Sequence, residues 1–228
     1  MGERTAEDRK VEGSTPSRGI FMFKKTILAR LSKADSFSIL NAIFGITSLC
    51  LLFSREWYAF VFILLAVLAD GMDGIVARKY GSSLPIIDEF ADMLSFVAAP
   101  SAMLFHKYSL IFLPLIYAYV FASIIHLLNY HYKTKEIFVG LPTPAGAIIV
   151  VSISILSFPV WLACIITAFI SLLIFFPIHY PRIEGMERVI GAFVIFLAIF
   201  LGCGYPIFVL LLILSTLAYV TLSPFKVR

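Results

Sequence analysis

Long apolar runs separated by short polar segments dominate the pattern along this chain. Each run comes close to the roughly 20 residues that a helix needs to cross a bilayer core of about 30 Å. Eight such runs occupy residues 36–53, 57–79, 86–105, 109–130, 143–158, 159–176, 187–202 and 206–222. Only Pro159 divides the fifth run from the sixth, so a count of six or seven stays open. The pattern predicts an all-α integral membrane protein with about eight transmembrane helices.

The chain before the first run has a different composition. Residues 1–19 are polar, and we expect them to be disordered. In residues 20–34, apolar side chains recur at helical spacing among basic ones, at Ile20, Phe23, Ile27 and Leu31. This pattern is typical of an interfacial amphipathic helix lying on a membrane surface, with a charged linker as the alternative. Residues 35–228 are the predicted transmembrane domain.

Basic residues gather on one side of the predicted topology. If the N-terminus lies in the cytoplasm, only Arg55 and Lys107 fall in outer loops. This distribution follows the positive-inside rule and predicts a cell membrane protein whose N-terminus faces the cytoplasm. The net charge of +4 is divided among separate loops, which gives a nucleic-acid partner no support. A mean hydropathy of +0.97 excludes an ordinary water-soluble domain.

Four aspartates stand where lipid should exclude charge. Asp70 and Asp73 lie three residues apart near the end of the second run, and Asp88 and Asp92 lie four apart at the start of the third. Ionised groups at membrane depth are costly and mark functional sites. Because a short turn joins the two runs, we expect the pairs to face each other at the cytoplasmic end. Hard oxygen ligands at this density suit Mg²⁺, Mn²⁺ or Ca²⁺, with room for two ions.

The helix face beside the first aspartate pair suits a phosphate ligand. Gly74 has no side chain to hold a ligand away, Ala77 keeps the next turn small, and Arg78 offers a planar guanidinium. We therefore predict metal-dependent chemistry on a phosphate. A divalent-cation transporter is the non-enzyme alternative, because transporters also place acidic groups at membrane depth.

The stretch from Asp70 to Asp92 resembles the signature of the CDP-alcohol phosphatidyltransferases, which is Asp, two residues, Asp-Gly, two residues, Ala-Arg, then a glycine and two aspartates four apart. Leu84 stands where the family has that glycine. The resemblance implies two divalent cations, Mg²⁺ or Mn²⁺, on Asp70, Asp73, Asp88 and Asp92. Ca²⁺ is an inhibitory or structural alternative. It also implies that Asp92 is the catalytic base on a small hydroxyl acceptor, and that a CDP-linked lipid contacts Asp70, Gly74, Ala77 and Arg78. A homodimer surrounded by membrane lipids is a further implication.

Flanking residues resemble the phosphatidylserine synthase branch of this family. Asp35, Ser38 and Asn41 are similar to the polar start of its first helix, and residues 140–147 to the start of its fifth. Serine is therefore the expected acceptor in a reaction of phospholipid biosynthesis that releases CMP. The candidate acceptor or lipid contacts are His126, Asn129, Gly140, Pro142 and Pro144. Inositol phosphate, glycerol phosphate or a neutral polyol stay open as acceptors, and both diacylglycerol and archaeol stay open as the lipid.

Overall fold

The computed structural model describes residues 31–80, 84–131, 138–180 and 185–222, and for residues 130, 131, 138 and 139 it describes the backbone alone. The predicted disordered segment 1–19 and nearly all of the predicted interfacial helix 20–34 lie outside these ranges. Where the description begins, Ser32 caps the first helix, because its hydroxyl accepts from the backbone N–H of Asp35 and the Asp35 carboxylate accepts from the backbone N–H of Ser32.

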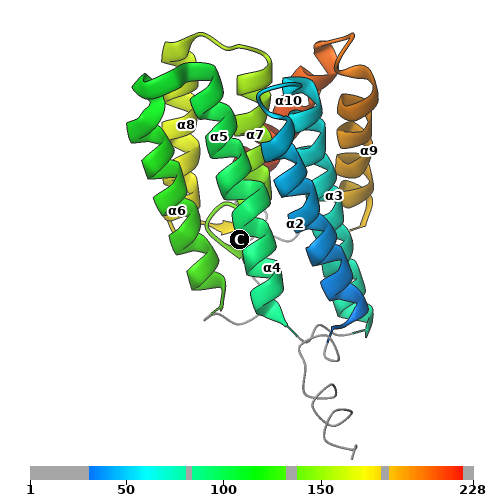
Figure 1. Ribbon diagram of the computed structural model, residues 1–228. Coiled ribbons are helices and arrows are strands. Elements are labelled where there is room, and N and C mark those ends of the chain that lie inside the picture. Colours follow the sequence, from blue (N-terminus) through cyan, green and yellow to red (C-terminus); the bar gives the residue numbers. More distant parts are fainter. Residues whose placement is uncertain (1–30, 81–83, 132–137, 181–184, 223–228) are drawn as a thin grey trace, which may run out of the picture.

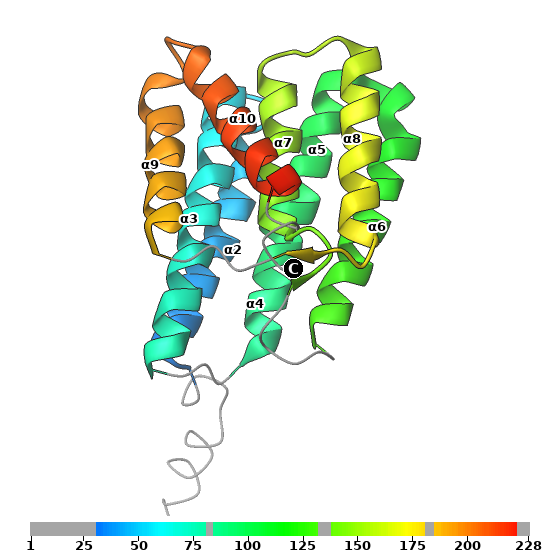
Figure 2. The same ribbon diagram turned by 180° about the vertical axis from the view of Figure 1, so that it is seen from behind.

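The helices run alternately up and down in one bundle (Figures 1 and 2). Helices α2 (Lys33–Leu51) and α3 (Glu56–Tyr80) form an antiparallel pair. Helix α4 (Pro85–Asp92), the π-helical turn η2 (Met93–Ala98) and α5 (Ala99–Tyr108) follow one another without interruption. The 3₁₀ turn η3 (Ser109–Phe112) leads into α6 (Leu113–His131). The remaining elements are β1 (Phe138–Val139), α7 (Thr143–Ile155), α8 (Val160–Phe175), β2 (His179–Tyr180), α9 (Gly185–Leu201) and α10 (Ile207–Leu222).

All eight predicted apolar runs are helical. Three stretches are long and apolar enough to cross a membrane, namely Lys33–Leu51, Glu56–Tyr80 and Pro85–Asn129, the last of which contains both α5 and α6. Helices α7, α8 and α10 are apolar but shorter, with 13, 16 and 16 residues. The chain is therefore a predominantly helical membrane protein, and the count of eight spans stays a prediction.

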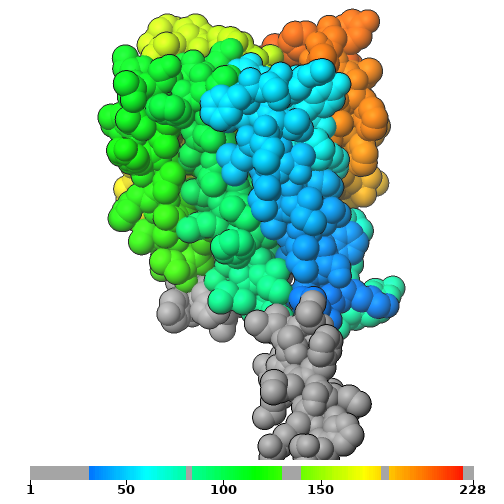
Figure 3. Space-filling view, viewed as in Figure 1, coloured from blue at the N-terminus to red at the C-terminus, as the bar shows by residue number. Residues whose placement is uncertain are grey.

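Helix α7 lies in the middle of the bundle. Every residue from Gly146 to Ser154 is buried, as expected of a helix that is surrounded by others. Ile149 and Ile153 belong to a core cluster with α6, α8 and α10, whereas Val151 belongs to a second cluster with α3 and α9. The two halves of the bundle thus meet on α7. Side chains of α2, α4, α5 and α6 form the face seen in Figure 3.

The π-helical turn η2 has a local cause and a distant support. Pro100 has no backbone N–H, so the carbonyl of Phe96, four residues earlier, cannot accept the usual α-helical hydrogen bond. The hydroxyl of Tyr119, in α6, donates to that carbonyl at 2.6 Å, and both side chains are fully buried. Tyr119 therefore satisfies a backbone group that lies one turn beyond Asp92.

Candidate metal centre and active site

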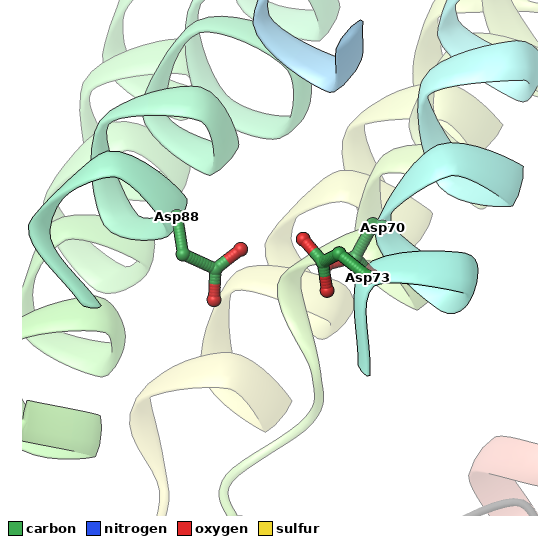
Figure 4. A group of neighbouring side chains, drawn as sticks. All are labelled: Asp70, Asp73 and Asp88. Atoms are coloured by element: carbon green, nitrogen blue, oxygen red, sulfur yellow. The ribbon is translucent and has the colours of Figure 1, made fainter. Parts of the chain in front are cut away.

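Three aspartates converge between α3 and α4. Asp70 and Asp73 project from α3, and Asp88 points toward them from α4 (Figure 4). One carboxylate oxygen of each lies within 4.8 Å of the other two. The Oδ1 atom of Asp88 is buried and has no hydrogen-bond donor among the described residues. Carboxylates at this spacing repel one another unless positive charge lies between them.

The three-aspartate group fits a hard divalent cation. Ligand oxygens bind Mg²⁺ at about 2.1 Å and Ca²⁺ at about 2.4 Å, so oxygens on opposite sides of one ion are roughly 4 to 5 Å apart. The observed spacing of up to 4.8 Å agrees with this range. A donor set made only of carboxylate oxygens favours Mg²⁺, Mn²⁺ or Ca²⁺ over softer metals. The geometry therefore supports a divalent-cation centre at the predicted position.

Asp92, the fourth predicted ligand and the predicted base, stands beside this group rather than within it. It is the last residue of α4, and its Oδ1 accepts a hydrogen bond of 3.0 Å from Nδ2 of Asn41. Its carboxylate lies within electrostatic range of Asp70, Asp73 and Asp88. In the described part of the chain, the site thus consists of three clustered carboxylates and a fourth that a neutral amide holds.

Helix α2 supplies polar partners to which the sequence analysis gave no role. The hydroxyl of Ser38 donates to Oδ2 of Asp73 at 2.9 Å, and Asn41 donates to Asp92. Both donors are buried, and their spacing of three residues places them on one face of α2. That spacing, on a helix predicted to lie in the membrane, is the signal that could have identified them as site residues.

The predicted nucleotide face runs along the end of α3. Asp70, Gly74 and Arg78 are spaced four residues apart and therefore share one face of the helix. A Cβ on Gly74 would lie 3.5 Å from Nη1 of Arg78, so the guanidinium folds back over the glycine. Ala77 is half-buried and Arg78 is exposed. The face is open toward the end of the bundle at which α3 terminates.

The start of α7 lies at the level of the aspartates. Ala66, Phe96 and Ala147 form one buried cluster between α3, η2 and α7. One turn below this cluster, each of the three helices carries a residue of interest, namely Asp70, Asp92 and Thr143. The first turn of α7, which contains Pro144 and follows Pro142, therefore stands opposite the carboxylates.

The remaining candidate contacts separate into a buried pair and an exposed residue. His126 is buried against the turn at Gly140, whose φ is +93°. A Cβ on Gly140 would lie 2.6 Å from the carbonyl oxygen of Ile174 and 2.8 Å from Nδ1 of His126. Asn129, one turn further along α6, is exposed. The structure thus gives His126 and Gly140 a packing role, and their contact with a substrate stays a prediction.

The sequence of this chain is similar to those of known proteins. Residues 31–177 match the family model described as CDP-alcohol phosphatidyltransferase. The chain is 33% identical over 181 residues to archaetidylserine synthase of Methanothermobacter thermautotrophicus, covering 72% of this chain and 76% of that relative. It is 30% identical over 154 residues to CDP-diacylglycerol–serine O-phosphatidyltransferase of Methanocaldococcus jannaschii, covering 65% and 73%. With the Bacillus subtilis protein of the same name, identity is 29% over 155 residues, covering 63% and 86%.

The matched region contains more than half of the chain and all four aspartates. It contains every element from α2 to α8 in full, so it includes every helix that contributes a residue to the site described above. From these matches and the site geometry, the chain belongs to the CDP-alcohol phosphatidyltransferase family and is a membrane transferase of that kind.

Proposed function

We propose that this protein transfers the phosphatidyl or archaetidyl group of a CDP-linked lipid to the hydroxyl of L-serine and releases CMP. The observation that carries the proposal is the convergence of Asp70, Asp73 and Asp88 with Asp92 beside them. The names of the relatives support serine as the acceptor, since each contains serine in its product or substrate.

Asp70, Asp73 and Asp88 would hold a first divalent cation, Mg²⁺ or Mn²⁺, and Asp92 would complete a second site with them. When bound, such cations neutralise the pyrophosphate of the donor and stabilise the negative charge on departing CMP. Ca²⁺ would occupy the same carboxylates as an inhibitor. The hydrogen bond from Ser38 orients the Asp73 carboxylate toward the centre of the group.

The Gly74–Arg78 face would bind the donor. Gly74 lets a phosphate approach the backbone of α3, and the guanidinium of Arg78 already lies over that glycine. A planar guanidinium can donate two parallel hydrogen bonds to one phosphate, which orients the phosphorus as well as attracting it. Ala77 leaves the neighbouring turn free for the nucleotide.

Asp92 would act as the general base. Its carboxylate takes the proton of the serine hydroxyl, and the serine oxygen forms a bond to the lipid-bearing phosphorus. The bond from that phosphorus to the oxygen shared with CMP breaks in line, and CMP leaves with the electron pair. Asp92 is suited to this role because Asn41 of α2 donates a hydrogen bond to its carboxylate. Ser38 of the same helix donates to the neighbouring carboxylate of Asp73.

The site would open to the cytoplasm where lipid headgroups meet acyl chains. Helices α2, α3, α4 and α6 extend beyond the ends of α8, α9 and α10 at the end of the bundle that carries the aspartates (Figure 1). Lysine and arginine residues predominate in the loops assigned to that side. We also propose that the chain has eight membrane spans and a surface helix in residues 20–34, and that it forms a homodimer.

Purified protein with CDP-diacylglycerol or CDP-archaeol tests the proposal directly. With Mg²⁺ or Mn²⁺, we expect CMP release with serine and not with inositol phosphate, glycerol phosphate or glycerol. Asp92→Asn should lower the rate by at least about 100-fold. Glu56→Gln is the matched control, because Glu56 pairs with His106 at 3.1 Å at the opposite end of α3. CMP release by Asp92→Asn at the wild-type rate would contradict the assignment of the base.

A further inference from the structure

A polar connection joins α2 to the turn that follows Asp92. Nδ2 of Asn41 donates to Oδ1 of Asp92 at 3.0 Å, and the hydroxyl of Ser95, in η2, donates to the backbone carbonyl of Asn41 at 2.8 Å. Gly45, one turn further along α2, makes room for this contact, because a Cβ there would lie 2.9 Å from Cα of Ser95. The part of α2 that carries Asn41 is therefore fixed directly against the end of α4.

The orientation of the Asn41 amide follows from its partner. An ionised carboxylate can only accept hydrogen bonds, so the amide nitrogen must face Asp92. The Oδ1 atom of Asn41 then points elsewhere, and it is buried without a hydrogen-bond donor among the described residues. A buried amide oxygen with no donor destabilises a fold, whereas leucine has a similar size and buries no polar atom. Stability therefore does not account for asparagine at this position, but the contact with Asp92 does.

On the basis of the proposed function, we propose that Asn41 is a positioning residue for Asp92. The hydrogen bond engages Oδ1 of the carboxylate and fixes its plane, which leaves Oδ2 to take the proton of the acceptor hydroxyl. Asn41 is fully buried and contacts the base. A residue that acts only through the base affects the chemical step and not the binding of substrates. Its loss should therefore lower kcat without raising either KM.

The test compares three variants of the full-length protein in the CMP-release assay. Asn41→Leu should lower kcat about 10- to 100-fold, as expected when a reacting group loses its orientation. Its KM values for serine and for the CDP-linked lipid should stay within about twofold of wild type. Its thermal unfolding midpoint in detergent should stay close to that of wild type, because removal of the unpaired buried oxygen offsets the loss of the hydrogen bond to Asp92. A merely structural asparagine would give the opposite result in the unfolding measurement.

The Ser95→Ala variant tests the position of Asn41 independently, because the Ser95 hydroxyl donates to the Asn41 backbone rather than to Asp92. It removes the hydrogen bond to the Asn41 carbonyl and should lower kcat less than Asn41→Leu does, again without raising KM. Thr47→Val is the control on the same helix, because the Thr47 hydroxyl donates only within α2, to the carbonyl of Ile43 at 2.8 Å. This control should keep the kcat and both KM values of the wild type.

The outcomes separate this inference from the proposed function. Wild-type protein that releases no CMP would refute the proposed function itself. An active wild type with an equally active Asn41→Leu variant would refute the role of Asn41, and so would a raised KM for serine at unchanged kcat. If Asn41→Leu does not fold, the inference fails on its stability prediction, and an unchanged kcat in Ser95→Ala would overturn it independently.

Discussion

Adding a methyl group to a glycine can destabilise the fold in two ways, by straining a backbone with positive φ and by steric overlap of the new Cβ. Four glycines allow these two costs to be measured separately. At Gly140, alanine would meet both costs, because the backbone has φ of +93° and the new Cβ would lie 2.6 Å from a backbone carbonyl oxygen. Gly185 has φ of +58°, and no atom of the described residues lies within 4 Å of a new Cβ, so it isolates the backbone cost. Gly45 has no positive φ but a contact of 2.9 Å with a backbone atom, so it isolates the steric cost. Gly191 has neither.

The expected sizes follow from these geometries. A residue with a Cβ in the left-handed region costs about 1 to 2 kcal/mol, and overpacking of a tight contact costs about 1 to 3 kcal/mol. Gly140→Ala should therefore lose about 2 to 5 kcal/mol of unfolding free energy, more than either Gly185→Ala or Gly45→Ala. Gly191→Ala should gain about 0.5 to 1 kcal/mol, because alanine favours the helix.

Thermal unfolding of the purified protein in one detergent measures all four variants. For a chain of this size, each kcal/mol corresponds to roughly 2 to 4 °C in the midpoint. The midpoints should rank Gly191→Ala above wild type, Gly185→Ala and Gly45→Ala below it, and Gly140→Ala lowest. A Gly140→Ala variant as stable as Gly185→Ala would refute the steric contribution of the Ile174 carbonyl, and one as stable as Gly191→Ala would refute both.

Three further predictions concern the site and the turn behind it. Asp88→Asn should weaken Mn²⁺ binding to the purified protein at least about tenfold in a calorimetric titration, because it removes a charge from the three-aspartate group; unchanged affinity would place the metal elsewhere. Tyr119→Phe should lose about 1 to 3 kcal/mol of unfolding free energy, because the Phe96 carbonyl loses the buried hydroxyl that donates to it; an unchanged midpoint would count against that hydrogen bond. Arg78→Lys should raise KM for the CDP-linked lipid more than KM for serine, since lysine lacks the planar fork, and an equal rise in both would contradict the donor role.

Features with local causes were predictable from the sequence. Each of the eight helical segments follows from the length of its own apolar run, and the aspartate pairs follow from spacings of three and four residues within a helix. The antiparallel meeting of Asp70 and Asp73 with Asp88 required only a short turn between neighbouring helices. The helical segments and the meeting of Asp70, Asp73 and Asp88 are confirmed, because they depend mainly on local sequence, whereas the roles of the four aspartates as metal ligands and base stay predictions.

Features that depend on distant contacts were not predictable in the same way. At the π-helical turn, the Phe96 carbonyl accepts a hydrogen bond from Tyr119, which is 23 residues away, and Pro100 is the local signal of the turn. Asp92, which lies beside the other three carboxylates, accepts its hydrogen bond from Asn41, which is 51 residues away. His126 is a candidate substrate contact through the family resemblance, whereas its burial against Gly140 appears only in the packed structure.

The π-helical turn also lets one continuous helix keep two different registers. An extra residue in a turn rotates everything before it by about 100° relative to everything after it. Asp88 and Asp92 can therefore face α2 and α3, while Ala99 and Met103 pack into the core with residues of α7. Deleting one residue of Met93–Ala98 would leave a helix of nearly the same length and hydrophobicity but would turn the two aspartates out of the site. The direction in which these aspartates point is thus set by the phase of a helix, which hydrophobicity and span length alone do not encode.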